Sequence, residues 1–258
     1  MGAASPAPAA GVPRPRVGIV SDRHRLCAAA GRPIEDAPLL LAAQIEAAGE
    51  SGVEFFQVRE ADLEAGALLR LVRELVTVAR GRVRVVVNDR ADIAAAAGAD
   101  LHLRVASLPL PRLRAWLSTD MWVSRAVHAR GDLAAAEGVD ALIVGTVRPT
   151  VSKPADTRWL GVEGLRRIAA VTPLPVFAIG GLTFADWPAL AGAGAAGIAA
   201  IGWMLPRSGE DAGMAVARAM ADLGALVTRG AVPPGIRSEG RAVGRAGEAQ
   251  VTGGSGSD

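Results

Sequence analysis

Several residue types are scarce in this sequence, and their scarcity argues against disulfides, nucleic-acid binding and membrane insertion. The single cysteine, Cys27, cannot form a disulfide within the chain, which favours a reducing, cytoplasmic compartment. Aromatic side chains make up 3% of the residues, too few to stack nucleic-acid bases, and the arginines are interspersed with acidic residues outside the tail at 229–258. No apolar run reaches the ~18 residues of a membrane-spanning helix. We therefore expect a cytoplasmic protein that binds neither nucleic acid nor a membrane.

Lysine and asparagine are each reduced to one copy. Lys153 is the only lysine among 28 basic residues, and Asn88 is the only asparagine. A bias toward arginine and alanine would remove both types wherever they are optional. A surviving copy is therefore a candidate for a specific role, although chance survival in a loop is the alternative for each.

The dominant pattern is an alternation of short β-rich runs with Ala/Leu-rich helical stretches. We predict eight strands, at 17–20, 54–59, 83–88, 100–103, 121–125, 141–145, 175–180 and 197–202. Runs such as 83–87 are apolar throughout, as parallel strands covered on both faces require. An open doubly wound sheet usually has five or six strands and a Gly-rich first turn, which is absent here. The sequence predicts an α/β fold, a single (β/α)8 TIM barrel.

Glycines set the predicted loop lengths. The predicted helical stretches are 38–48, 62–80, 91–97, 111–117, 132–137, 162–170, 184–191 and 210–226. Glycines suited to left-handed helix ends follow several of them, at Gly52, Gly81, Gly98, Gly138 and Gly194. The loops from helix to strand are therefore short, which places the working surface at the carboxyl ends of the strands.

The barrel is predicted to span residues 16–228. Residues 1–15 are rich in Ala, Pro and Gly and do not resemble a secretory signal, so we expect an N-terminal disordered tail. Residues 229–258 are rich in Gly, Arg and Ser without apolar periodicity, and we expect a second disordered tail there.

Glycines also end the last two predicted strands. Gly180 and Gly181 follow the seventh run, and Gly202 ends the eighth. Loops after strands seven and eight of such barrels often bind phosphate, because glycine lets backbone N–H groups approach the anion closely. Two glycine turns at these two places predict a phosphate site.

Polar side chains end other strands. The loop after the sixth run carries Thr150, Ser152 and Lys153, whose hydroxyl and ammonium groups suit phosphate oxygens. Gln57 and Arg59 alternate along the second run and so point to one side of it.

Asn88 and Asp89 end the third run. The amide suits a polar ring, and the carboxylate suits a divalent cation, which takes hard oxygen ligands. Capping of the following Ala-rich helix is the alternative for Asp89.

Four motifs at successive strand ends resemble the thiamine phosphate synthase/TenI family. They are Q-x-R at 57–59, N-D-R at 88–90, G-x-V-x-P-T-x-S-K at 145–153 and A-I-G-G at 178–181. The resemblance covers residues 17–205 and implies a TIM-barrel enzyme of thiamine biosynthesis. Synthases of this family join a pyrimidine diphosphate to a thiazole phosphate and release diphosphate with the help of Mg²⁺. TenI-type members tautomerise a carboxythiazole phosphate by moving a proton.

The resemblance also implies roles for individual residues. In a synthase, the groups that contact the pyrimidine diphosphate would be Gln57, Arg59, Asn88 and Lys153. Asp89 would help to bind Mg²⁺, and Thr150 and Ser152 would lie around the diphosphate and thiazole. The thiazole phosphate would be held by Gly180, Gly181 and Gly202.

The sequence departs from the synthase pattern at four positions. The expected lysine, metal-binding aspartate, strand-five serine and strand-eight serine are replaced by Ala61, Ser107, Ala126 and Gly202. Losing a lysine and a carboxylate weakens stabilisation of the leaving diphosphate. We therefore lean toward a TenI-like, tautomerase-type isomerase that binds a thiazole phosphate and needs no cofactor.

The tautomerase pattern is incomplete as well. Its proton-shuttling histidine is replaced by Thr146, and His128 is the candidate substitute, or else a residue that orients its loop. The alternatives are a diverged, Mg²⁺-dependent synthase and a non-catalytic protein that binds thiamine intermediates. The sequence leaves self-association into a homo-oligomer open.

Overall fold

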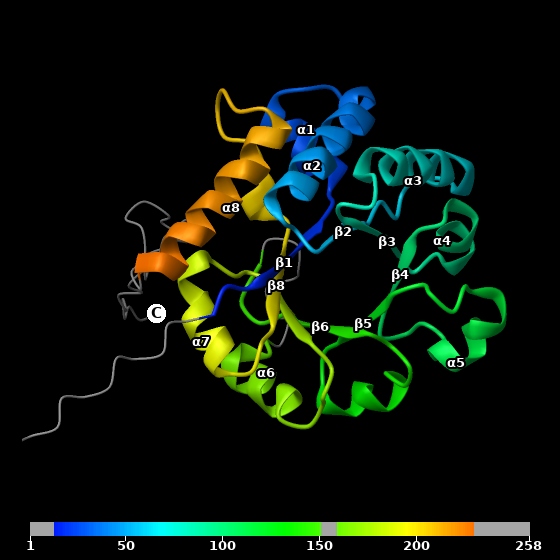
Figure 1. Ribbon diagram of the computed structural model, residues 1–258, viewed down its shortest axis with the longest axis vertical. Helices are drawn as coiled ribbons and strands as arrows, with labels where there is room; N and C mark the ends of the chain where they lie inside the picture. The colour runs from blue at the N-terminus through cyan, green and yellow to red at the C-terminus, as the bar shows by residue number, and fades with distance from the viewer. Residues whose placement is uncertain (1–12, 151–158, 230–258) are drawn as a thin grey trace, which may run out of the picture.

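The computed structural model describes residues 13–150 and 159–229 and shows a closed barrel of eight parallel strands in chain order (Figure 1). The strands are β1 (Arg16–Val20), β2 (Phe55–Val58), β3 (Arg84–Asn88), β4 (Asp100–Leu103), β5 (Val123–Val127), β6 (Ala141–Gly145), β7 (Val176–Ile179) and β8 (Gly197–Ala200). All eight predicted strands are present, with ends that differ by a few residues at most. The predicted TIM-barrel fold is confirmed.

The centre of the barrel is filled by side chains rather than open. Phe55 and Phe177 meet edge to face with ring centroids 5.2 Å apart, and the buried Val86 and Ile143 pack with them. Gly18 makes room for this packing, because a Cβ there would lie 2.0 Å from the Phe55 ring. The apolar centre and the closed sheet give the strand ends a fixed frame.

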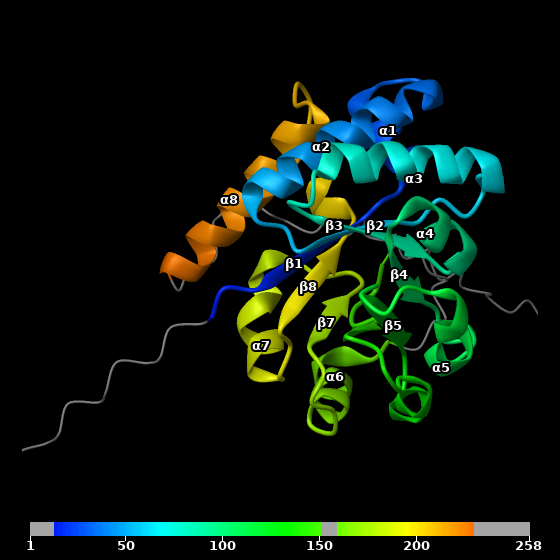
Figure 2. The ribbon, with the colours of Figure 1, turned by 45° about the vertical axis from the view of Figure 1, so that its right-hand side comes forward.

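Helices surround the barrel (Figure 1). The helices are α1 (Arg23–Ala30), α2 (Ala37–Ser51), α3 (Ala65–Ala79), α4 (Ala91–Ala97), α5 (Leu110–Leu113), α6 (Gly161–Ala169), α7 (Trp187–Gly192) and α8 (Ala212–Arg229). Figures 1 and 2 both show α2 beside α8, and the Gln44 amide of α2 donates to the Met204 carbonyl at 2.6 Å. Sequence analysis missed α1, and the helix predicted at 132–137 is a 3₁₀ turn, Arg130–Ala135.

The predicted left-handed glycines are confirmed. All five lie between φ 66° and φ 93°, a region that side chains other than glycine rarely adopt. After α3 the left-handed C-cap itself is Arg80, at φ 49°, and Gly81 follows it. The helix-to-strand connections are therefore tight at the amino ends of the strands.

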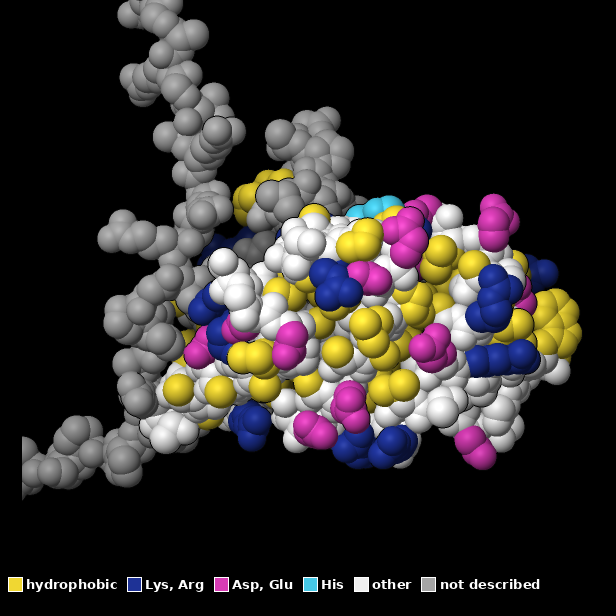
Figure 3. Space-filling view, turned by 90° about the horizontal axis from the view of Figure 1, so that it is seen from above, with side chains coloured by type: hydrophobic (Ala, Val, Ile, Leu, Met, Phe, Trp, Pro, Cys, Tyr) yellow, Lys and Arg dark blue, Asp and Glu magenta, His cyan; other side chains and the backbone are white. Residues whose placement is uncertain are grey.

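The outside of the barrel is mixed in charge. On the face shown in Figure 3, acidic side chains lie among basic ones over the helices at the top of Figure 1. Near the first strand, the Trp187 indole donates to the Pro13 carbonyl at 2.6 Å and ties the approach to β1 to α7. In the part of the chain that the structure describes, we find no helix with the length and apolarity to cross a membrane.

Some predictions fall outside the described residues. Ser152 and Lys153 belong to the segment 151–158, and most of the two predicted tails lies in 1–12 and 230–258. The roles predicted for Ser152 and Lys153 and the two tails therefore stay predictions.

Candidate active site

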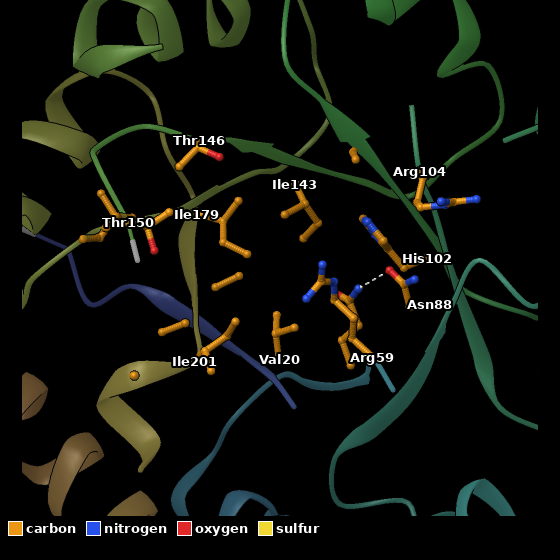
Figure 4. Close-up of a pocket in the computed structure, with 18 of the residues that line it drawn as sticks. Val20, Arg59, Asn88, His102, Arg104, Ile143, Thr146, Thr150, Ile179 and Ile201 are labelled. Carbon is orange, nitrogen blue, oxygen red and sulfur yellow. Dashed lines mark hydrogen bonds between the residues drawn. The ribbon is translucent and has the colours of Figure 1, made fainter. Parts of the chain in front are cut away.

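A cavity of about 520 Å³ lies at the carboxyl ends of the strands (Figure 4). Eight of the predicted site residues line it, namely Gln57, Arg59, Asn88, His128, Thr150, Gly180, Gly181 and Gly202. The apolar part of the wall includes Val20, Ile143 and Ile179. The structure thus brings together residues that lie up to 145 positions apart in the sequence, from Gln57 to Gly202.

Two amide side chains stand together at one side of the cavity. The Gln57 Nε2 group donates to the Asn88 Oδ1 atom at 2.9 Å, as the dashed line in Figure 4 shows. The two residues lie at or next to the ends of neighbouring strands, β2 and β3, and Gln57 is buried. The bond fixes both amide planes, so the pair can present a donor and an acceptor in set directions to a polar ring.

At Gly180 and Gly181 an anion could approach the backbone of the cavity wall closely. A Cβ at Gly181 would lie 2.0 Å from the Pro149 carbonyl oxygen, and one at Gly180 would lie 2.2 Å from a Thr146 methyl carbon. Both glycines also have positive φ, 99° and 61° in chain order. Only glycine therefore fits these two positions, and their backbone lines the cavity.

Arg25 lies at the same end and was missed by sequence analysis. Its Nη2 atom would lie 3.6 Å from a Cβ placed on Gly202. Arg25 stands on α1, whose N-cap Asp22 accepts a hydrogen bond from the Arg25 backbone at 3.0 Å. The Ser-Asp-Arg sequence after β1 is an N-cap signal that could have revealed this helix. Glycine backbone and a guanidinium together suit a phosphate.

Arg59 and Arg104 provide positive charge beside Asn88 (Figure 4). The Arg59 backbone donates to the Ser21 hydroxyl at 2.9 Å, and that hydroxyl donates to the Glu60 carboxylate at 2.5 Å. Burial raises the pKa of Glu60, while hydrogen bonds from Ser21 and Arg23 act in the opposite direction. This buried network fixes the backbone from which the Arg59 side chain enters the cavity.

Arg125 was also missed and holds the loop that carries Arg104. It is buried in β5 and donates to the carbonyls of Val105, Ser107 and Leu108 at 3.1, 2.7 and 3.2 Å. Burial lowers the pKa of its guanidinium. A lone arginine inside an apolar strand pattern was the signal in the sequence. Its role is to shape the loop after β4.

Asp89, predicted to help bind Mg²⁺ in a synthase, is already paired with protein groups. Its carboxylate accepts a hydrogen bond from the Ser107 hydroxyl and forms an ion pair with the Arg104 guanidinium. Among residues 13–150 and 159–229, no three His, Cys, Asp or Glu side chains come together as a metal site. Mg²⁺ is usually held by one or two carboxylates together with waters and substrate phosphates, and a guanidinium paired with such a carboxylate repels it. Asp89, paired with Arg104 and Ser107, therefore does not fit Mg²⁺.

The alternative prediction for Asp89, a helix cap, is wrong. The N-cap residue of α4 is Arg90, and Asp89 lies one residue earlier with a φ of 59°. This left-handed backbone, supported by a bond from the Asp89 N–H to the His102 carbonyl at 2.8 Å, turns the residue away from the helix start. The carboxylate reaches the loop after β4 instead.

Two histidines, His102 and His128, line the cavity and have different hydrogen-bond partners. His102, in β4, is buried and its Nδ1 atom lies 2.9 Å from the Ser124 hydroxyl. Burial lowers the pKa of His102 to about 3, so the ring is neutral near pH 7. The His128 Nδ1 atom donates to the Gly145 carbonyl and joins the loop after β5 to the end of β6. This contact suits a loop-orienting role, and the shuttle role of His128 stays a prediction.

Fold and cavity define a (β/α)8 barrel with a glycine-rich, cationic site at the carboxyl ends of its strands. The chain belongs to the family described as thiamine monophosphate synthase, whose model matches residues 33–203. This confirms the resemblance drawn from the motifs and places the chain among enzymes of thiamine biosynthesis.

Individual relatives are similar over most of their length. A thiamine-phosphate synthase of Anaeromyxobacter dehalogenans is 39% identical over 194 residues, 74% of this chain and 87% of that protein. One from Salinispora arenicola is 37% identical over 174 residues, 66% of this chain and 83% of that protein. A solved structure, thiamine phosphate pyrophosphorylase from Pyrococcus furiosus, superposes with a TM-score of 0.63 at 24% identity, covering 81% of this chain and 97% of that chain. The last likeness shows the shared fold.

Proposed function

We propose that the protein is a thiamine phosphate synthase, which joins a pyrimidine diphosphate to a thiazole phosphate and releases diphosphate. The observation that carries the proposal is the placement of positive charge at two ends of one cavity. Arg25 lies beside Gly202, whereas Arg59 and Arg104 lie around Asn88. Two anionic substrates need two such places, and a single thiazole phosphate needs one. The synthase names of the relatives support the same choice.

Each end of the cavity suits one substrate. The thiazole phosphate fits the end formed by Arg25 and the backbone of Gly180 and Gly181. The polar pyrimidine ring fits the amide pair of Gln57 and Asn88, which leaves its diphosphate toward the guanidinium side. The apolar wall between the two ends excludes water and strengthens the electrostatic interactions in the cavity.

The guanidinium groups act on the leaving group. When the bond between the pyrimidine methylene carbon and the diphosphate oxygen breaks, the electron pair leaves with the diphosphate. Arg59 and Arg104 stabilise the negative charge that develops on that oxygen, usually the largest contribution to catalysis. The thiazole nitrogen supplies the electron pair for the new carbon–nitrogen bond. No step is routed through Mg²⁺, because the residues around Asp89 do not fit it.

The lean of the sequence toward a tautomerase stays a prediction with less support. Thr146 lines the cavity where that pattern places its proton shuttle, and a hydroxyl is a poor acid or base near neutral pH. His128 keeps its Nε2 atom for proton transfer, because Nδ1 bonds to Gly145.

A product assay tests the proposal. The purified chain is incubated with both synthase substrates and, separately, with the carboxythiazole phosphate alone, and products are followed by mass. We expect thiamine phosphate in the first reaction and no isomerisation in the second. Isomerisation would favour the tautomerase, and binding of the thiazole phosphate without turnover would favour the non-catalytic protein.

A further inference from the structure

The corner of the cavity at Asp89 holds a guanidinium where a metal was expected. Arg104 lines the cavity, and its guanidinium is ion-paired with the Asp89 carboxylate. Ser107 occupies the position at which the resemblance expects a second aspartate, and its hydroxyl donates to the same carboxylate. Both oxygens of Asp89 are thus engaged by protein donors.

The Arg104 guanidinium is held in place by the loop that carries it. The Arg104 backbone donates to the Ser107 hydroxyl at 2.9 Å, and Arg125 binds three carbonyls of the same loop. The Arg104 side chain is 63% exposed, so the N–H groups that do not contact Asp89 are open to solvent. A donor that is positioned before the ligand arrives loses little conformational freedom on binding.

A positioned guanidinium can do for a diphosphate what a divalent cation does. It carries permanent charge and offers up to five donors in a planar fork that matches phosphate oxygens in pairs. Arg59 provides a second guanidinium beside Asn88 (Figure 4). A divalent cation at Asp89 would have to displace the Arg104 ion pair and would then be repelled by that charge.

We propose that Arg104, held by Asp89, replaces the divalent cation at this site, so that the protein binds diphosphate without a metal. In naming diphosphate as the ligand, the inference rests on the proposed synthase function. Arg104 is then a substrate-binding residue, and Asp89 and Ser107 are positioning residues for it.

Binding of inorganic diphosphate to the full chain tests the inference without turnover. Titration calorimetry is run on the chelator-treated protein, once with EDTA and once with MgCl₂. We expect dissociation constants that agree within about threefold, because charge-assisted hydrogen bonds from arginine supply the binding. A loss of affinity of more than tenfold in EDTA would overturn the inference.

Variants assign the effect to Arg104. We expect Arg104→Gln to weaken metal-free binding by about tenfold or more, as the loss of a charged donor predicts. Arg90→Gln is the matched control, because Arg90 is ion-paired with Asp92 at 2.6 Å near the same strand end without lining the cavity. Equal binding by the two variants, with unchanged melting temperatures, would contradict the assignment.

A double variant gives the converse test. Arg104→Gln with Ser107→Asp removes the guanidinium and adds a carboxylate that faces Asp89. We expect its diphosphate binding to become stronger by about tenfold or more when MgCl₂ replaces EDTA, since two carboxylates and the ligand can then share the ion. Should the double variant stay indifferent to Mg²⁺, Arg104 would not be the metal's substitute.

The outcomes separate this inference from the proposed function. Metal-free diphosphate binding without thiamine phosphate formation would leave the inference standing and remove the synthase. Synthase turnover that requires Mg²⁺ for diphosphate binding would do the reverse.

Discussion

The glycines that line the cavity, Gly180, Gly181 and Gly202, differ in how tightly the chain surrounds them. Gly181 combines a φ of 61° with a carbonyl oxygen 2.0 Å from any added Cβ, whereas Gly202 has the Arg25 Nη2 atom as its nearest neighbour, 3.6 Å away. Two glycines that look alike in the sequence can therefore differ in how much space a side chain would have.

We expect Gly181→Ala to lower the free energy of unfolding by roughly 1–3 kcal/mol, because it adds backbone strain and a steric conflict with the Pro149 carbonyl. Gly202→Ala, the control for stability, should change it by less than about 0.5 kcal/mol. Urea unfolding of both variants measures the difference. Equal stabilities would show that the loop at Pro149 yields freely.

His128 can be tested by a substitution that keeps one of its two nitrogens. Asn places an amide N–H near the position of Nδ1 and can still donate to the Gly145 carbonyl, whereas Ala cannot. If His128 orients its loop, His128→Asn retains turnover within about tenfold of the wild type and His128→Ala loses more. A proton shuttle would make both variants lose 10²- to 10⁴-fold or so alike. Steady-state kinetics of the two variants decide between these roles.

At the scale of elements, the loop after β4 depends on a side chain from β5. Arg125 is buried and donates to three carbonyls of residues 105–108. The loop carries Arg104, so Arg125 helps to set the backbone of the cavity wall beside Asn88.

We expect Arg125→Met to cost about 2 kcal/mol or more of stability, because it removes three hydrogen bonds made by a buried side chain and leaves part-buried carbonyls without donors, and to raise KM for the pyrimidine diphosphate. Arg114→Met is the matched control, since Arg114 donates at longer range, 3.2 and 3.4 Å, to only two carbonyls among the described residues, those of Ser118 and Met121. Its cost should stay below about 1 kcal/mol. Urea unfolding and kinetics of both variants check this, and a KM unchanged in Arg125→Met would separate the loop from substrate binding.

The elements that sequence predicted best are those with strong local signals. The strands are apolar runs buried on both faces, and the helix ends require glycine, so both can be read from neighbouring residues. Helix α1 has a polar sequence and buries its arginine Arg23 through partners 37 and 39 positions away, Glu60 and Asp62. Its apolar pattern is therefore too weak to predict it, and Arg25 was lost with it.

The site residues likewise divide into those with a local sequence signal and those that depend on long-range contacts. Those at strand ends were predictable, because the carboxyl ends of parallel strands converge in any barrel. Arg104 follows β4 directly and Arg125 interrupts the apolar pattern of β5, but their roles arise from contacts with Asp89 and with the loop after β4, which the local sequence does not reveal.

For the molecule as a whole, His102 makes stability depend on pH. Its pKa is lowered from 6.5 to about 3 in the folded state by burial, so the unfolded chain binds a proton more readily than the folded one. The contribution of His102 to the free energy of unfolding is fully present above pH 6.5 and decreases as the pH is lowered from 6.5 toward 3.

We expect the wild type to lose about 2–3 kcal/mol more stability than His102→Gln between pH 7.5 and pH 4.5, from the free energy per unit of pKa. Urea unfolding at the two pH values measures it, and comparison with the variant removes the contribution of carboxylates such as Glu210, whose pKa is lowered by Arg218. Parallel pH dependence of the two proteins would show that His102 does not carry the effect.

The five left-handed glycines between helices and strands lie at the end of the barrel opposite the cavity. Changes at the amino ends of the strands therefore act on stability alone, whereas changes at the carboxyl ends, such as Gly181→Ala, can alter both stability and the cavity. Because the closed sheet holds every strand between two neighbours, loops of the cavity can be replaced without rebuilding the frame. The side chains at the carboxyl ends of the strands can thus change while the barrel itself persists.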